Sequence, residues 1–333
     1  MIQNLKNKKI LLFCPRFFNY ETEIKKELEN QGAIVDYFDE RFGNTFLIKS
    51  IIRLRIKILV NYLSNKYYLK ILKSIKNKNY DIVFFISPET ITNFAMEQLK
   101  KNLKNSKFIL YMWDSFKNKK ESKRLVKYFD KVYSFDKEDC KKYKINFLPL
   151  FYIDKYDNKS FQEIEFKYDI SFVGTGHEDR FLIINKIQNN LKRFNTNNYF
   201  YLFLQSKKIY FFRKIFDKRL KNAKIEDFHF KSLAHEEIIN ISEKSKAILD
   251  IQRDIQSGLT MRTIEIALGM RKKLITTNLD IKEYDFYDKN NILIIDRKNP
   301  IINKEFLETN YHELNEKIYQ EYSIKNWIKN LFI

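Results

Sequence analysis

The chain has 333 residues, which is enough for two domains with separate hydrophobic cores. Hydrophobic residues make up 44% of it and charged residues 31%, which excludes a disordered chain, and only 6 glycines and 4 prolines exclude a fibrous or linker-rich architecture. The net charge of +20 predicts an anionic partner: nucleic acid, an anionic membrane surface or an anionic small substrate.

The amino-terminal half alternates apolar runs with helical spacing, as in a nucleotide-type fold. The opening strand, helix and strand lack the G-x-G-x-x-G motif, so we do not expect this half to hold a dinucleotide. Strands are predicted at residues 9–14, 33–38, 81–86, 108–112, 131–135 and 147–150, with helices at 20–31 and 46–75.

A polar, irregular stretch at 152–166 is the predicted linker, and a second strand series follows it. Its strands are expected at residues 168–173, 199–204, around Phe228, 247–251, 274–277 and 292–295. Strands that alternate with helices predict parallel sheets, so the fold class is α/β with two Rossmann-like halves. The expected domains are 1–151 and 167–309, with a helical segment at 310–333.

The most informative stretch runs from Lys246 to Asn278 and reads as strand, polar loop, helix, strand. Ligands of parallel sheets bind beyond the carboxyl ends of the strands, where this stretch places Gly258, Thr260, Arg262 and Glu265. Helix N–H groups and Arg262 suit a diphosphate, and Glu265 suits ribose hydroxyls. The alternative is a surface ion pair between Arg262 and Glu265. For Thr260 two roles are open: capping of the helix or a hydrogen bond to phosphate.

The first strand of the second half is followed by Gly174-Thr175-Gly176-His177-Glu178-Asp179-Arg180. Gly174 and Gly176 allow close backbone approach to a ligand, and His177 and Arg180 offer donors to phosphate oxygens. The alternative is a tight turn in which an acidic residue caps the next helix.

Together these segments resemble GT-B glycosyltransferases, specifically bacterial lipopolysaccharide or capsule enzymes of the CgeB-like type. The resemblance rests on Gly258, Arg262 and Glu265 and on the segments KKILLFCPRF, YMWDS and YDISFVGTGHEDR; the loop 253–257 departs from the family's acidic pattern. It implies two Rossmann-like domains facing across a cleft, a carboxyl-terminal helix that packs back on the first domain, and a glutamate that holds the nucleotide ribose. It also implies a nucleotide-sugar donor in the second half and a glycan or lipid-linked acceptor in the first.

An inverting transfer needs a general base for the acceptor hydroxyl, and two carboxylates of the first half are candidates. Asp114 follows the strand 108–112, and Glu89 follows the strand 81–86. For both residues, capping of the next helix is the alternative role.

No acidic residue occurs from Arg41 to Tyr80, where ten basic residues alternate with apolar ones. Leu54, Ile58, Tyr62 and Leu63 are expected to form an apolar stripe that lies on an anionic membrane. The alternative is an ordinary surface helix whose lysines face water.

The leading hypothesis is a metal-independent glycosyltransferase of surface polysaccharide biosynthesis, with no cofactor beyond its nucleotide-sugar. The four histidines are scattered and no D-x-D motif stands in a fitting loop. Cys14 and Cys140 predict no disulfide, the N-terminal segment lacks signal-peptide character, and no apolar run has membrane-spanning length, so we expect a cytoplasmic protein at the inner membrane face. The rivals are a nucleic-acid-binding protein, for which no compact basic and aromatic motif is found, and an inactive nucleotide-sugar-binding scaffold.

Overall fold

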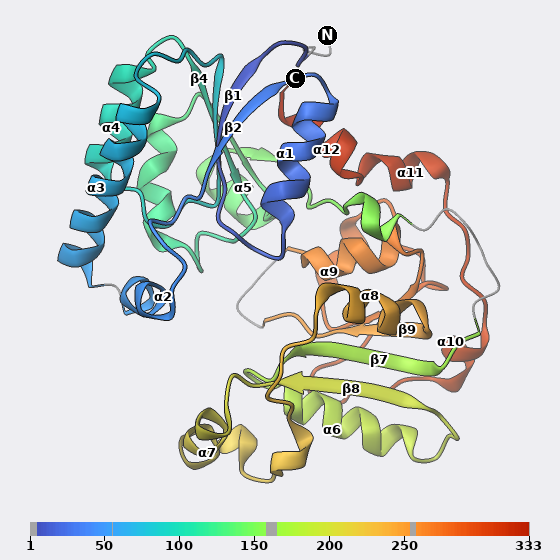
Figure 1. Cartoon of the computed structure of the whole chain (residues 1–333). Helices are drawn as coiled ribbons and strands as arrows, with labels where there is room; N and C mark the ends of the chain where they lie inside the picture. Colours follow the sequence, from blue (N-terminus) through green and yellow to red (C-terminus); the bar gives the residue numbers. More distant parts are fainter. Residues whose placement is uncertain (1–4, 55, 158–164, 254–257, 333) are drawn as a thin grey trace. The chain divides into compact units, whose positions relative to one another are not determined.

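The computed structural model describes residues 5–54, 56–157, 165–253 and 258–332, which form two compact units (Figure 1). The first unit comprises the chain up to Leu150, Gly258, and the carboxyl-terminal residues from Ile324. The second comprises Phe151 to Arg253 and Leu259 to Ser323.

The first unit is built on a parallel sheet with the strand order β2-β1-β3-β4-β5-β6. Its central strands are continuous apolar runs because helices cover both faces of a parallel sheet; every residue of β3 is buried. The strands are β1 (Lys9–Phe13), β2 (Ile34–Phe38), β3 (Ile82–Ile86), β4 (Lys107–Met112), β5 (Lys131–Ser134) and β6 (Asn146–Phe147).

The helices of this unit are α1 (Tyr20–Asn30), α2 (Phe46–Arg53), α3 (Lys57–Ser74), α4 (Asn93–Asn102), α5 (Lys137–Tyr143) and α12 (Ile324–Leu331). The side chains of Thr92 and Asp136 cap α4 and α5. Helix α12 lies beside α1 (Figure 1), and its Trp327 ring is 4.8 Å from that of Tyr111. The carboxyl-terminal helix thus completes the core of the first unit.

The second unit has a parallel sheet with the strand order β11-β10-β9-β7-β8. Its strands are β7 (Tyr168–Thr175), β8 (Asn198–Phe203), β9 (Ser245–Asp250), β10 (Lys273–Thr276) and β11 (Ile292–Ile294). Its helices are α6 (Arg180–Leu191), α7 (Lys207–Phe216), α8 (His235–Glu243), α9 (Met261–Ile264), α10 (Lys304–Glu308) and α11 (Glu316–Glu321). The α/β class with two Rossmann-like halves is therefore confirmed.

Several predicted elements differ in the structure. The strand expected around Phe228 is a single bridge between Phe203 and His229, because a 3-10 turn at Ile225–Asp227 precedes it directly. In agreement with the one or two helices expected over residues 46–75, this stretch forms α2 and α3, and the segment 310–333, expected to be helical, contains α11 and α12. The first part of the predicted linker packs against the rest of the second unit, since Tyr152 and Tyr156 are buried. Its residues 158–164 lie outside the described residues.

Candidate functional site

The helix after β9 carries the predicted donor-site residues Arg262 and Glu265, is capped by Thr260, and changes its winding at Glu265. Met261–Ile264 is α-helical, and Glu265–Gly269 continues as a π-helix. Single π-helical turns inside helices are frequent at functional sites. The predicted helix over 259–270 is therefore present, with an irregular turn that begins at the predicted ribose ligand.

Glu265 is a buried carboxyl group that forms no ion pair with any residue the structure describes. It is 6% exposed, and its Oε1 has no hydrogen-bond partner among the described residues. Burial raises the pKa of Glu265 to about 8, so the group is mostly protonated at neutral pH. Buried polar atoms are nearly always paired, so an orphaned oxygen at a sheet edge points to a ligand. A neutral carboxyl can both donate to and accept from a hydroxyl pair.

Asp250, the last residue of β9, forms hydrogen bonds with the first residues of α9 and its cap. Its Oδ2 accepts hydrogen bonds from the hydroxyls of Thr260 and Thr263, both at 2.7 Å. The Thr260 oxygen in turn accepts from the Thr263 backbone N–H at 3.2 Å. Thr260 is thus the helix cap, and its hydroxyl is committed to that role.

Arg180 joins the end of β7 to the end of β9. Its Nε and Nη2 donate to the carbonyl of Ile251 at 2.9 and 2.6 Å, and its Nη1 donates to the carbonyl and hydroxyl of Thr175. Burial lowers the pKa of Arg180 to about 10, which leaves it charged at neutral pH. The Arg180 guanidinium was predicted to bind phosphate, but most of its N–H donors thus form hydrogen bonds within the protein.

Arg262 differs from Arg180 in this respect. It is half-buried, and none of the residues that the structure describes forms a hydrogen bond or ion pair with its side chain. The two arginines are close enough that the charge of Arg262 lowers the pKa of Arg180. The structure therefore brings Arg180 and Arg262 together at one edge, with Arg262 as the cation available to an anion.

The loop after β7 is held by arginines that the sequence analysis did not single out. Arg297 donates to both carboxylate oxygens of Asp179, at 3.0 and 2.7 Å, and also to Thr277. Arg253 donates to Glu178 at 2.7 Å, and Arg213 donates to the Gly176 carbonyl. The available clue was an arginine shortly after each of two strands, β9 and β11.

His177, in the same loop, is neutral. Burial and then the charge of Arg180 lower its pKa to about 4. Its buried Nδ1 has no hydrogen-bond partner in the described part of the chain. As a neutral imidazole, His177 can offer a phosphate one N–H rather than a positive charge.

The glycines have packing roles that the sequence did not reveal. A Cβ on Gly174 would lie 2.8 Å from the Phe172 ring, and one on Gly176 would lie 2.7 Å from Phe228. Gly258 belongs to the first unit, has φ +75°, and would bring a Cβ to 3.0 Å from Phe135. Of the loop before it, residues 254–257 lie outside the described residues.

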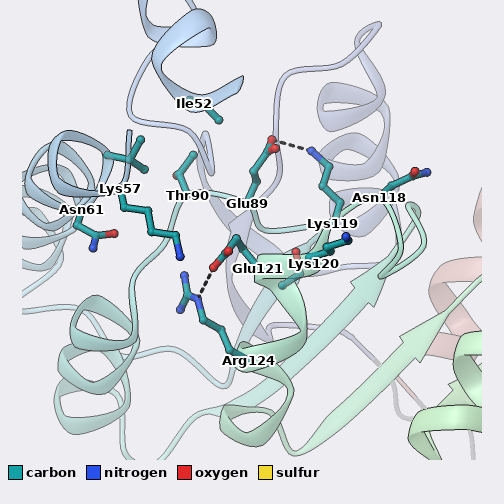
Figure 2. A pocket seen from close by; sticks show the side chains of 12 residues that line it. Ile52, Lys57, Asn61, Glu89, Thr90, Asn118, Lys119, Lys120, Glu121 and Arg124 are labelled. Carbon is teal, nitrogen blue, oxygen red and sulfur yellow. Dashed lines mark ion pairs between the residues drawn. The ribbon is translucent and has the colours of Figure 1, made fainter. Parts of the chain in front are cut away.

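In the first unit, Glu89 lines a cavity of about 70 Å³ (Figure 2). Lys119 lies 2.6 Å and Arg41 3.2 Å from its carboxylate. Burial raises the pKa of Glu89, but these two cations outweigh it and hold the pKa below its ordinary value. Such a carboxylate is a weak proton acceptor. The remaining lining residues are Ile52, Lys57, Val60, Asn61, Thr90, Asn118, Lys120, Glu121, Ser122 and Arg124.

Glu40 positions the loop that carries Glu89. Its Oε1 accepts hydrogen bonds from the backbone N–H groups of Glu89, Thr90 and Ile91 at 2.8, 2.6 and 3.2 Å. Burial raises the pKa of Glu40 to about 7. The other predicted base, Asp114, lies two residues beyond β4 and is half-buried.

Known structures share this architecture over nearly the whole chain. The HepE protein of Anabaena, in complex with UDP-glucose, matches with a TM-score of 0.60 and 9% identity, over 97% of this chain and 98% of that one. OtsA in its apo form matches with a TM-score of 0.58 and 10% identity, over 98% and 99%. The chain has a GT-B fold.

A third similar structure is the UDP-GlcNAc 2-epimerase of Methanocaldococcus jannaschii in complex with UDP-GlcNAc and UDP. It matches with a TM-score of 0.53 and 12% identity, over 98% of both chains. No protein-family model matches the chain, and no curated protein matches it in sequence. At these identities the GT-B likeness concerns the fold.

The described residues contain no group of three or more His, Cys, Asp or Glu side chains arranged to hold a metal ion. None of the helices formed by these residues combines the length and the apolar character that crossing a membrane requires.

Proposed function

We propose that this protein is a glycosyltransferase that moves a sugar from a nucleotide-sugar donor to a glycan or lipid-linked acceptor. The observation that carries the proposal is Glu265, a buried, neutral carboxyl. Among the described residues its Oε1 has no partner, and neither does the side chain of Arg262, one helical turn earlier. The similar HepE structures hold UDP-glucose, or UDP and glucose, which supports a donor of this class.

In this proposal the second unit binds the donor. Glu265 holds the ribose hydroxyls, and Arg262 with the exposed edge of the loop after β7 holds the diphosphate. Arg180, Arg253 and Arg297 act indirectly, because they fix the loops that face the ligand. Stabilisation of the departing diphosphate by Arg262 is the main catalytic contribution, and it needs no metal ion.

The first unit binds the acceptor. Asp114 is the preferred general base, because Glu89 is already neutralised by Lys119 and Arg41. The acceptor belongs to surface polysaccharide biosynthesis, such as lipopolysaccharide or capsule, in keeping with the CgeB-like resemblance. The acid-free stretch 41–80 contacts the inner face of the cytoplasmic membrane, and its exposed Ile58 and Tyr62 on α3 support this contact.

The fold is shared with an epimerase, so the experiment must separate transfer from epimerisation. The purified chain is incubated with UDP-, GDP-, CMP- and dTDP-sugars, and the products are identified by mass spectrometry and chromatography. Release of a nucleoside diphosphate or monophosphate together with free or transferred sugar supports the proposal. Conversion of one nucleotide-sugar into its epimer supports the other activity. Binding without any product supports the inactive scaffold, and RNA binding with a steep salt dependence and no donor binding supports the nucleic-acid rival.

A further inference from the structure

Helix α7 of the second unit turns its apolar side chains toward solvent. Phe212, Ile215 and Phe216 are 63%, 76% and 71% exposed, and Phe211 is 56% exposed. A surface helix normally buries its apolar face and presents polar residues to water. In α7 this arrangement is reversed, and a group of exposed apolar residues on one helix marks an interaction surface.

The orientation of α7 is fixed by the residues on its inner face. Tyr210 is buried, and its hydroxyl donates to the Ala223 carbonyl at 3.0 Å. Arg213 donates to the Gly176 carbonyl and, at 3.2 Å, to Asp217. Lys214 donates to the same Ala223 carbonyl at 2.7 Å. With about 100° per residue, these contacts direct Phe212, Ile215 and Phe216 away from the unit.

The apolar face is bordered by positive charge. The single acidic residue between positions 207 and 224 is Asp217, which is already paired with Arg213 and Arg219, at 3.2 and 2.8 Å. Arg213 and Lys214 belong to the inner face of α7. The other basic residues of this segment are all exposed: Lys207, Lys208, Lys218, Arg219, Lys221 and Lys224. An apolar centre with a uniformly basic border matches an anionic surface that has an apolar interior.

We propose that α7 binds the second unit to an anionic lipid membrane. Phe212, Ile215 and Phe216 enter the boundary between headgroups and acyl chains, and the surrounding lysines contact lipid phosphates. A second copy of the chain fits this face less well, because a two-fold contact would bring two basic borders together. This surface is separate from the stretch 41–80 of the first unit and does not depend on the proposed enzymatic activity.

Sedimentation of the full chain with lipid vesicles tests the proposal. We expect binding to phosphatidylcholine vesicles that contain phosphatidylglycerol, and at least about tenfold weaker binding to pure phosphatidylcholine. The triple variant Phe212→Ser, Ile215→Ser, Phe216→Ser should bind anionic vesicles at least about tenfold more weakly than the parent chain. Ile301→Ser, which removes an apolar side chain of the same unit that is 47% exposed, is the matched control and should bind as the parent does.

A second measurement covers the possibility that the triple variant does not fold. The single variant Phe212→Trp should show a blue-shifted indole emission on addition of anionic vesicles, beyond any shift of the parent, whose tryptophans Trp113 and Trp327 lie in the first unit. Undiminished binding by a folded triple variant, or no shift for Phe212→Trp, would overturn the proposal. The proposal would also be overturned if the parent chain forms a dimer, the triple variant does not, and neither protein binds vesicles.

Discussion

Arg297 and Asp179 form a bidentate ion pair although 118 residues separate them in the sequence. The pair joins the segment after β11 to the loop after β7, and both side chains are largely buried. Arg297→Ala leaves the Asp179 carboxylate without this partner, so the free energy of unfolding should fall by about 1.5–3 kcal/mol.

Urea denaturation followed by circular dichroism measures this loss. Arg253→Ala is the matched control, because Arg253 contacts the same loop through Glu178 but its own side chain is 45% exposed. The Arg253→Ala variant should lose less than about 1 kcal/mol of unfolding free energy, as is usual for exposed ion pairs. Equal losses of unfolding free energy for the two variants would contradict the claim that Arg297 stabilises this loop more than Arg253 does.

Arg180 and Arg262 should respond differently to replacement by alanine. Arg180→Ala leaves the buried carbonyl of Ile251 without its donor, so the protein should lose about 1–3 kcal/mol of stability. Arg262→Ala should leave the melting temperature nearly unchanged and weaken UDP binding by about 1.5–3 kcal/mol, with little effect on uridine. Calorimetric titrations with both ligands distinguish the two effects. Equal loss for UDP and uridine would remove Arg262 from the diphosphate site.

The stability of the protein should fall as the pH rises from 7 to 8. Glu265 has a folded pKa of about 8, above that of an unfolded glutamate, so the folded chain binds more protons between these two values. Stability is therefore lost as the pH rises through this window, and the loss from pH 7 to 8 is about 1 kcal/mol.

Glu265→Gln cannot ionise and should lack this part of the pH dependence. Urea denaturation of both proteins at pH 7 and pH 8 gives the difference. Glu40→Gln is a useful comparison, because the pKa of Glu40 is raised to about 7 and its contribution falls mainly below pH 7. If the parent and Glu265→Gln lose stability in parallel from pH 7 to 8, Glu265 is ionised in the folded protein.

Asp114→Asn tests the general base. The variant keeps the shape of the side chain and removes its basicity, so sugar transfer should slow by roughly 100-fold or more with donor binding and melting temperature nearly unchanged. Glu89→Gln, by contrast, leaves Lys119 and Arg41 without their carboxylate and should mainly lower the melting temperature. A large loss of turnover in Glu89→Gln together with full activity in Asp114→Asn would identify Glu89, and not Asp114, as the general base.

The positions of most strands along the chain could be predicted from the sequence because the central strands are apolar runs. Residues 82–86 and 247–250 are buried throughout, and such runs identify strands of parallel sheets. The region around Phe228 misled the prediction, because its apolar residues pack beside Gly176 and Tyr210 rather than extending the sheet. Local composition cannot distinguish these two outcomes.

Candidate site residues could be proposed from the sequence mainly where one short segment carries them. Arg262 and Glu265 follow one strand on one helix, so their spacing already suggested a joint role. The contact of Arg180 with Ile251 depends on packing between segments 71 residues apart, which no local pattern encodes. The helix after β9 was predicted, but its π-helical turn at Glu265 was not. For the same reason the sequence could not show that Arg180 is occupied while Arg262 is available.

The central claim is that Glu265 binds the nucleotide part of a nucleotide-sugar donor. The most direct measurement is a calorimetric titration of the parent chain and of Glu265→Ala with UDP-glucose and with the GDP-, CMP- and dTDP-sugars, at a pH where both proteins are folded. We predict that at least one donor binds the parent and binds Glu265→Ala at least about tenfold more weakly, because a buried hydrogen-bonding group is lost. Unchanged affinity of Glu265→Ala for the donor that binds the parent would contradict the claim, as would the absence of binding by any donor.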